Sequence, residues 1–192
     1  MKRIAVFASG NGTNAENIFN YFSKSPVGRV VNLYCNNKNA KVINRFGLKK
    51  IPVFLFSKKE LVGSKKIDLL LSENKIDYIV LCGFLLKIPE RIICNYKDKI
   101  INIHPSLLPK YGGGGMYGEN VHKSVLKNND SVSGITIHYV NKNYDEGGIV
   151  FQKSCNLSKN ESLNSLMQKI KFLEKKHFPR VVEKIILLYY KK

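Results

Sequence analysis

The sequence predicts an α/β protein with a Rossmann-like open twisted sheet, mainly parallel with an antiparallel C-terminal part, and helices on both faces. Up to residue 104, short apolar runs alternate with longer amphipathic segments, a pattern typical of parallel strands joined by right-handed helical crossovers. Two later strand-like runs, 133–140 and 147–157, are separated by only a short connection. Because a parallel crossover needs a dozen or more residues, an antiparallel pair or a looped excursion is expected here rather than another crossover. A length of 192 residues suits a single domain spanning 1–192.

The elements of the parallel part follow from local patterns. Strands are expected at the β-rich apolar runs 3–9, 29–35, 51–56, 77–84 and 99–104. Helices are expected at 13–22, 39–48, 57–74 (with a restart near Ser64) and 89–96. Ser57 and Glu60 form an S-x-x-E capping box, and Pro89 suits the start of its helix.

The C-terminal part adds two helices to the antiparallel pair. The first is expected near 119–128. In the second, Leu163, Leu166, Ile170 and Leu173 recur at helical spacing. Pro179 is expected to kink or split that helix, because proline removes a backbone hydrogen bond in a helix interior.

Composition and charge narrow the protein class. The formal net charge is +18, but only five of the 32 basic residues are arginine, the residue favoured for bidentate phosphate and base contacts. The lysines are spread along the chain, and Lys, Asn and Ile share A/T-rich codons, which favours a mutational bias over a nucleic-acid partner. Apolar runs are too short for a membrane helix, and the N-terminus is interpreted as a strand rather than a signal peptide.

The cysteines indicate neither a disulfide framework nor a metal site. Cys35, Cys82, Cys94 and Cys155 are scattered without a C-x-x-C pair. We expect buried thiols in a reducing cytoplasm.

The loop "ASGNGTNAENI" joins the first expected strand to a helix. Gly10 and Gly12 allow close backbone approach, and a helix N-terminus favours an anion. The spacing fits neither a dinucleotide fingerprint nor a Walker loop. A phosphate site and an ordinary strand–helix turn are equally supported by this stretch alone.

Two polar side chains end the fifth expected strand in "INIHPSLLPKY". Asn102 and His104 are two residues apart, so they face the same side of a strand. Ligands bind beyond the carboxyl ends of parallel strands, where an amide and an imidazole form a plausible oxyanion site. From this stretch alone, the slightly favoured interpretation is that His104 is a hydrogen-bonded core histidine and that Asn102 caps a turn.

"TIHYVNKNYDEGGIVFQ" supplies a second histidine and a carboxylate. His138 lies in an alternating strand and Asp145 in a glycine-flanked loop. A carboxylate there can orient or charge a nearby imidazole, although such an aspartate is more often only a turn residue.

Together these strings resemble the folate-dependent formyltransferases over essentially the whole chain. The matching pieces are "SGNGTN" after the first strand, "GF" after the fourth, "NIHPSLLPKY" after the fifth, and "IHYV" followed by "DEGGIVFQ". The phosphate-type first loop is similar to that of the members acting on glycinamide ribonucleotide in de novo purine biosynthesis. The resemblance implies the formyltransferase fold and formyl transfer from 10-formyltetrahydrofolate to the amine of that ribonucleotide, without a metal.

The resemblance also implies the site residues. Asn102, His104 and Asp145 would be the catalytic trio, with Asn102 and a protonated His104 donating to the tetrahedral oxyanion and Asp145 favouring the imidazolium. His138 would support Asp145. The ribonucleotide would contact Gly12, Thr13, Asn14, Ala15, Lys171 and Glu174, with Glu16 near the same end. The folate would contact Leu85, Leu86, Lys87, Ile88, Asn102, Asn141 and Tyr144.

The loop after "LLPKY" departs from many relatives, because it reads "GGGGMYGENVHKSV" and is expected to be mobile. His122 in this stretch is interpreted as a helix residue. Small-molecule substrates, no nucleic-acid or membrane partner, and a monomer or homodimer are expected.

Three rival functions remain. Methionyl-tRNA formyltransferases carry an extra C-terminal domain, whereas this sequence ends at Lys192. Formyltetrahydrofolate hydrolases usually carry an N-terminal regulatory domain, which we do not expect here. A lysine-rich nucleic-acid-binding protein would leave Asn102, His104 and Asp145 unexplained.

Overall fold

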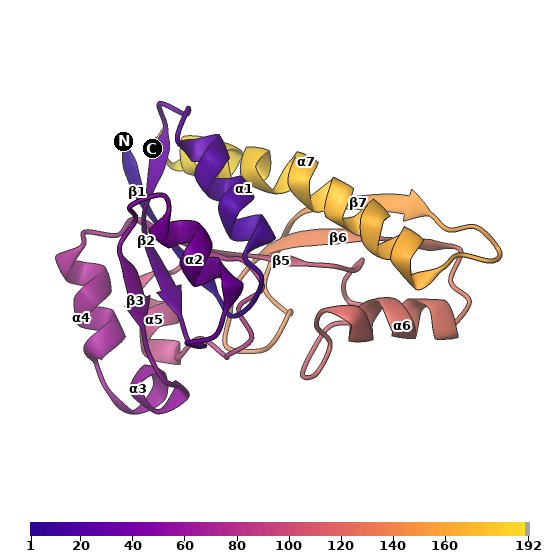
Figure 1. Cartoon of the computed structure of the whole chain (residues 1–192), viewed down its shortest axis with the longest axis horizontal. Coiled ribbons are helices and arrows are strands. Elements are labelled where there is room, and N and C mark those ends of the chain that lie inside the picture. Colours follow the sequence, from indigo (N-terminus) through magenta and orange to yellow (C-terminus); the bar gives the residue numbers. More distant parts are fainter. Residues whose placement is uncertain (191–192) are drawn as a thin grey trace.

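The computed structural model describes residues 1–190 and contains a seven-stranded sheet in the order β3-β2-β1-β4-β5-β6-β7 (Figure 1). The strands are β1 (Lys2–Ala8), β2 (Gly28–Cys35), β3 (Val53–Leu55), β4 (Tyr78–Leu81), β5 (Ile100–His104), β6 (Val132–Tyr139) and β7 (Ile149–Asn156). The helices are α1 (Thr13–Phe22), α2 (Lys41–Gly47), α3 (Lys58–Gly63), α4 (Lys66–Glu73), α5 (Glu90–Asn95), α6 (Glu119–Lys127) and α7 (Leu163–Tyr190).

The direction of the strands confirms the predicted fold class. Strands β1 to β5 pair in parallel, whereas β6 runs antiparallel to β5 and β7 antiparallel to β6. Helical connections join the parallel strands, and the short link 140–148 joins β6 to β7. The change of direction therefore falls at the point where the crossover pattern ends in the sequence.

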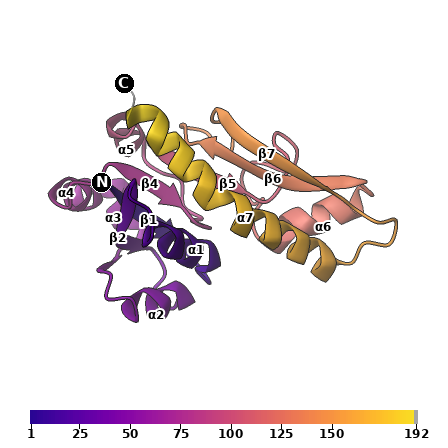
Figure 2. The same ribbon diagram turned by 90° about the horizontal axis from the view of Figure 1, so that it is seen from above.

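Two helical layers cover the sheet. Helices α1, α2, α6 and α7 contribute apolar side chains to a core on one face, and α3, α4 and α5 contribute to a core on the other. Figure 2 shows α7 running across the sheet from the β4–β5 region to the end near α6. The second core reaches only as far as β5 and the residue after β6, so the edge strand β7 is largely exposed.

The structure narrows one sequence-based expectation and corrects another. Of the two outcomes expected at Pro179, a split is excluded, because helix α7 is continuous through the proline. Its apolar face is buried on both sides of the proline, from Leu166 to Ile186, so packing offsets the lost backbone bond. All four cysteines are free, but only Cys35 and Cys82 are buried, whereas Cys94 is exposed and Cys155 half-buried.

The predicted capping box is confirmed. The Ser57 side chain accepts a hydrogen bond from the Glu60 backbone N–H at 3.1 Å, and the Glu60 carboxylate accepts from the Ser57 backbone N–H at 2.8 Å. These two reciprocal bonds satisfy backbone donors that a helix start leaves unpaired.

Strand order places a crevice at the carboxyl ends of β1, β4 and β5. The chain leaves β1 toward β2 and β3 on one side, and later crosses to β4 and β5 on the other. Such a reversal opens a gap between the connections that leave neighbouring strands, and ligands of open α/β sheets bind there.

Candidate active site

A cavity of about 500 Å³ occupies this crevice. Its walls come from the β1–α1 loop, the segment after β4, the ends of β5 and β6, the glycine-rich loop before α6, and one face of α7. Of the residues expected in the site, the following line it: Asn14, Leu85, Leu86, Lys87, Ile88, Asn102, His104, His138, Asn141, Tyr144, Asp145, Lys171 and Glu174.

Asn102 and His138 face each other across the antiparallel β5–β6 pair, where they are register partners. Asn102 Nδ2 lies 3.1 Å from His138 Nε2 and 3.5 Å from Asp145 Oδ1. His138 Nδ1 lies 2.8 Å from the carbonyl of Tyr139, so that nitrogen carries the hydrogen in a neutral ring. Nε2 is then an acceptor, and Asn102 donates to it.

His104 is fixed between a loop carbonyl and a carboxylate. Its Nε2 donates to the carbonyl of Tyr111 at 2.7 Å, and its Nδ1 lies 3.5 Å from Asp145 Oδ2. Burial lowers the pKa of His104, and the Asp145 carboxylate and the Tyr111 carbonyl offset this only in part. Because desolvation outweighs the attraction of Asp145, the ring is favoured in its neutral form in the ligand-free protein, and a protonated His104 during the reaction stays a prediction.

Asp145 connects the reaction centre to the glycine-rich loop. Its backbone has φ 57°, in the left-handed region, and its Oδ2 accepts from the Gly113 N–H at 2.9 Å. Burial raises the pKa of Asp145, but the neighbouring His138 and His104 rings and the hydrogen bond from the Gly113 N–H lower it by more. The carboxyl is therefore ionised at neutral pH, and it accepts hydrogen bonds from Asn102 and from the Gly113 N–H.

The turn after β5 is attached to the neighbouring strands. Thr136 Oγ1 donates to the Ser106 carbonyl at 2.7 Å and accepts from the Leu108 N–H at 3.0 Å. Gln152 on β7 donates to the Leu108 carbonyl at 2.9 Å. These bonds hold the "HPSLLPK" segment, and with it the Tyr111 carbonyl, against His104.

The other end of the cavity is formed by Asn14, Lys171 and Glu174. Burial raises the pKa of Glu174 to about 7, while a hydrogen bond from Asn14 and the charge of Lys171 act in the opposite direction. At neutral pH the carboxyl is therefore divided between its protonated and ionised forms, and it can donate or accept a hydrogen bond.

Three predicted contacts at this end do not line the cavity. Gly12 has φ 76°, and an added Cβ would lie 2.3 Å from Val42 Cγ2, so its side-chain position is filled by α2. Thr13 is exposed and Ala15 is fully buried in the core, which leaves only their backbone N–H groups to meet a ligand. Gly12 N-caps α1, and these N–H groups open its first turn.

Glu16, expected near the same end, does not line the cavity either. It forms ion pairs with Arg45 and, at 3.1 Å, with Lys49. The hydrogen bond from Lys49 is the largest factor that lowers the pKa of Glu16. Its carboxylate is therefore already occupied by α2 and the residues that follow it.

The opposite wall is mostly apolar. The segment 84–88 and the loop 141–145 face each other across the cavity, and Lys87 Nζ lies 6.0 Å from the centre of the Tyr144 ring. Leu85 and Tyr144 are exposed large hydrophobic side chains. Exposed apolar surface beside a polar site is typical of a pocket for a flat ligand.

Sequence reasoning missed several residues of the cavity: Asn11, Met116, Tyr117, Glu119, His122, Met167 and Ile170. Met167 and Ile170 were hidden because their helical spacing is that of an ordinary core face. His122 does lie on a helix, as expected, but it also lines the cavity and is 6% exposed. The long loop before it could have indicated that α6 borders the site.

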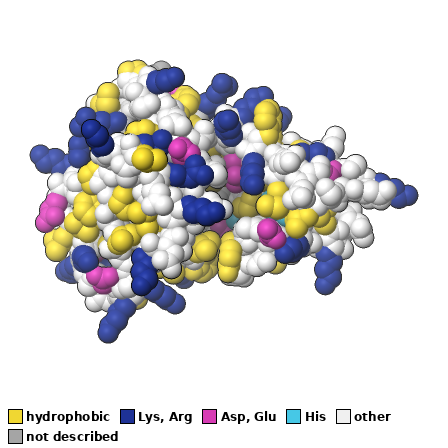
Figure 3. Space-filling view, in the orientation of Figure 1, with side chains coloured by type: hydrophobic (Ala, Val, Ile, Leu, Met, Phe, Trp, Pro, Cys, Tyr) yellow, Lys and Arg dark blue, Asp and Glu magenta, His cyan; other side chains and the backbone are white. Residues whose placement is uncertain are grey.

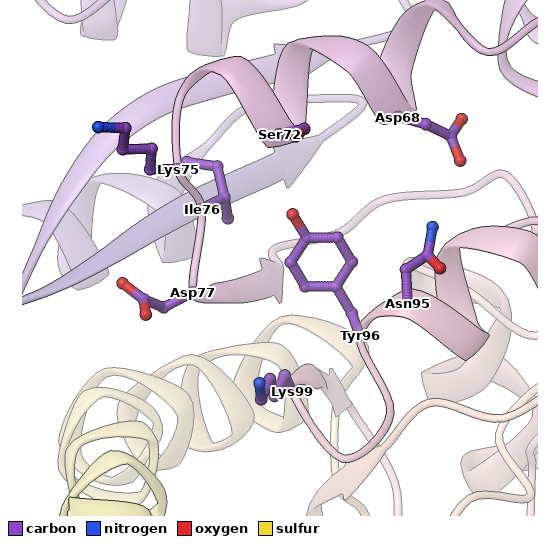
Figure 4. Close-up of a pocket in the computed structure, with 8 residues that line it drawn as sticks. All are labelled: Asp68, Ser72, Lys75, Ile76, Asp77, Asn95, Tyr96 and Lys99. Atoms are coloured by element: carbon purple, nitrogen blue, oxygen red, sulfur yellow. The ribbon is translucent and has the colours of Figure 1, made fainter.

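A second cavity, of about 380 Å³, lies at the amino ends of β4 and β5, between α4 and α5 (Figure 4). Its two carboxylates are already paired, since Asp68 lies 2.9 Å from Arg91 and Asp77 3.1 Å from Lys2. The Tyr96 ring projects between the two helices in this view. Neither a nucleophile nor a general base is poised here, so the chemistry is assigned to the first cavity.

Lysine and arginine side chains are scattered over the face drawn in Figure 3. Over residues 1–190, no group of three or more His, Cys, Asp or Glu side chains is arranged to bind a metal ion. Over the same residues, no helix combines the length and the apolar character that a membrane span requires.

The chain matches a known protein family over most of its length. Residues 2–182 match the formyl transferase family model. The chain is 34% identical over 191 residues to the phosphoribosylglycinamide formyltransferase of Bacillus subtilis, covering 97% of this chain and 95% of the relative. It is 36% identical over 188 residues to the chloroplastic phosphoribosylglycinamide formyltransferase of Arabidopsis thaliana, covering 94% of this chain but only 64% of that protein.

Solved structures agree in fold. The crystal structure of phosphoribosylglycinamide formyltransferase from Bacillus halodurans superposes with a TM-score of 0.86 at 32% identity, covering 96% of this chain and 95% of the other. Glycinamide ribonucleotide transformylase 1 from Geobacillus kaustophilus gives 0.87 at 32% identity, covering 97% and 99%. With a family model that spans nearly the whole chain, with a relative of which the chain covers 95% and with a common fold, the chain belongs to the formyl transferase family.

Proposed function

We propose that this protein transfers the formyl group of 10-formyltetrahydrofolate to the amine of glycinamide ribonucleotide, a step of de novo purine biosynthesis. The observation that carries the proposal is that one cavity holds three kinds of surface. Asn102, His104 and Asp145 lie in its centre, Asn14, Lys171 and Glu174 at one end, and an apolar wall at the other. The names of the relatives support the same reaction.

The reaction needs a nucleophilic attack and a proton transfer. The substrate amine attacks the formyl carbon, forming a C–N bond and placing negative charge on the formyl oxygen. The bond from carbon to N10 of the folate then breaks, and a proton lost by the attacking amine is delivered to the leaving N10. Asn102 Nδ2 and His104 donate to the oxyanion, and the ionised Asp145 accepts the amine proton through water.

The donors are not fully free in the ligand-free protein. The His104 Nε2–H is bound by the Tyr111 carbonyl, and Asn102 Nδ2 is bound to His138. We infer that entry of the reactants displaces the loop 111–118 far enough to release His104 toward the formyl oxygen. In this state the burial that lowers the pKa of His104 is offset by the oxyanion, which favours the imidazolium.

The two substrates are assigned to opposite ends. The phosphate is placed at the N-terminus of α1, where the first-turn backbone N–H groups favour an anion, with the Lys171 ammonium nearby. Glu174 and Asn14 face the ribose hydroxyls. The pterin of the folate lies against 84–88 and 141–144, and Lys87 is placed to meet the carboxylates of its glutamate tail.

We further propose that the protein acts in the cytoplasm on these small molecules, as a monomer or homodimer, without a nucleic-acid or membrane partner. Four free cysteines support a reducing compartment. The scattered distribution of lysines in Figure 3 argues against a nucleic-acid groove.

The test supplies 10-formyltetrahydrofolate to purified protein together with glycinamide ribonucleotide, with initiator methionyl-tRNA, or with water alone. We expect turnover only with the ribonucleotide. Folded protein that shows no turnover with the ribonucleotide overturns the proposal, and turnover with the tRNA or water alone reassigns the acceptor.

A further inference from the structure

His122 is a buried polar residue that the proposed reaction does not use. It lies on α6, it is 6% exposed, and it lines the active-site cavity. Its Nδ1 is fully buried and has no hydrogen-bond partner. Leaving a buried polar atom unpaired costs about 1–3 kcal/mol, so a site that retains such a residue is expected to use its other polar atom.

The surroundings of His122 keep the ring neutral. Burial lowers its pKa, and the neighbouring charge of Lys171 lowers it further, while Glu119 acts in the opposite direction. A neutral imidazole carries one N–H group and one lone pair. Because buried N–H groups without a partner are rarer than buried acceptors without one, the hydrogen belongs on Nε2 and not on the orphaned Nδ1.

The position of His122 selects the part of the ligand it can meet. Besides Glu119 of its own helix, its electrostatic neighbours are Lys171, at the ribonucleotide end, and His104, at the reaction centre. The folate wall is built from other segments, 84–88 and 141–145. A ligand whose amine lies at His104 and whose phosphate lies near Lys171 therefore carries its amide and ribose past His122.

We propose that His122 is a specificity residue for the ribonucleotide, whose Nε2–H donates to an oxygen of the glycinamide or ribose moiety between the reacting amine and the phosphate. This inference rests on the proposed function. It assigns to α6 a direct part in acceptor recognition, next to Lys171 and Glu174 of α7.

The test compares His122→Phe, which keeps a flat ring but removes the donor, with His122→Asn, which keeps a shorter donor. We expect the KM for glycinamide ribonucleotide to rise about three- to tenfold in His122→Phe and to be partly restored in His122→Asn. The KM for the folate and kcat should stay unchanged. His177→Phe is the control, because His177 stacks on Phe151 outside the cavity.

The melting temperature of the variants distinguishes a recognition role of His122 from a structural role. Because His122→Phe removes an orphaned polar atom, its melting temperature should not fall. A lowered melting temperature together with an equal rise of both KM values would show a structural role and overturn the inference. If His122→Phe does not fold, calorimetric titration of His122→Asn and wild-type protein with the ribonucleotide decides it, since equal affinity contradicts a recognition role.

The same measurements distinguish this inference from the proposed function. Wild-type protein that neither binds nor formylates glycinamide ribonucleotide overturns both. Wild-type protein that formylates it while His122→Phe has the same KM overturns only the role of His122.

Discussion

The two ends of the cavity differ in how their polar groups are held. At the reaction centre, Asn102, His104 and His138 lie on strands, and each has a hydrogen-bond partner within the protein, such as the Tyr111 carbonyl at 2.7 Å from His104. At the ribonucleotide end, Lys171 and Glu174 lie on α7. There the pKa of Glu174 is raised by burial.

From this difference we infer that the reaction centre positions the reacting groups and that the α7 end binds the substrate. Strand residues are fixed by the ladder of backbone bonds, so their side chains hold their positions before the ligand arrives, and only their hydrogen-bond partners have to be exchanged. On α7, Glu174 accepts a hydrogen bond from Asn14, and we expect its remaining acceptor positions and the Lys171 ammonium to bind the sugar and phosphate. Changes at the first end should therefore lower kcat, and changes at the second should mainly raise KM.

The largest expected effect is that of His104→Ala. It removes the donor and proton-transfer group at the reaction centre, and general acid–base groups contribute about 10²–10⁴-fold to rate. We expect a kcat loss of that order, with the KM for the ribonucleotide little changed, measured by steady-state kinetics. His177→Ala serves as the matched control. A kcat near that of wild type in His104→Ala would contradict the assignment of the reaction centre.

Gly112→Ala should disturb the same centre from the loop. An added Cβ would lie 2.7 Å from Leu108 Cδ2 and 3.2 Å from Asp145 Cβ, and Leu108 is buried. Since displacement of a catalytic group by about 1 Å can cost about 10²-fold, we expect a kcat loss up to that size.

Gly114→Ala provides the comparison, because nothing lies within 4 Å of its added Cβ. Its kcat should match that of wild type. If the two substitutions lower kcat equally, loop flexibility rather than contact with Asp145 governs the rate.

Lys171→Met tests the ribonucleotide end. A charge-assisted hydrogen bond contributes about 1.5–3 kcal/mol, and the exposure of Lys171 places the expected effect at the lower limit. The KM for the ribonucleotide should rise about tenfold, since 1.4 kcal/mol corresponds to a factor of ten, while kcat remains. Lys184→Met, an exposed lysine further along α7, should leave both unchanged. A fall in kcat without a change in KM would contradict the expectation that changes at the ribonucleotide end mainly raise KM.

Much of the fold could be predicted because local and long-range patterns agree. The run 77–84 is nearly continuously apolar because β4 is buried on both faces, and the short link after β6 predicted an antiparallel pair. The continuity of α7 through Pro179 could not be predicted from the sequence. The cost of one lost backbone bond is local, whereas the burial that offsets it comes from residues far along the chain.

The sequence predicts the position of a site residue where the two-residue period of a strand sets the direction of its side chain. It does not do so where the packing of helices and loops sets that direction. Asn102 and His104 share a face by their spacing of two, so their convergence follows from the sequence. The protonation state of His104 could not follow, because it depends on how completely the loop at Tyr111 buries the ring. Ala15 and Glu16 follow the loop in sequence, but the packing of α1 and α2 turns them away from the cavity.

The smallest expected effect concerns the pH dependence of the ribonucleotide end. Burial raises the pKa of Glu174 to about 7. If the carboxylate accepts hydrogen bonds from ribose hydroxyls, kcat/KM for the ribonucleotide rises as pH increases through 7. In Glu174→Gln this rise should be lost, while a rise near pH 6 from the second ionisation of the substrate phosphate remains. Glu73→Gln, exposed on α4, should keep the wild-type profile.

Ionisation of Glu174 is expected to favour ribonucleotide binding but to lower the free energy of unfolding. The folded-state pKa of Glu174 lies above its ordinary value of 4.5, so its contribution to stability is complete below pH 4.5 and is lost as pH rises through 7. Glu174→Gln, which cannot ionise, should therefore gain in free energy of unfolding relative to wild type between pH 5 and pH 8, measured by urea denaturation. A difference that stays constant over this range would show that Glu174 is ionised throughout and would remove the physical basis for the pH effect on binding.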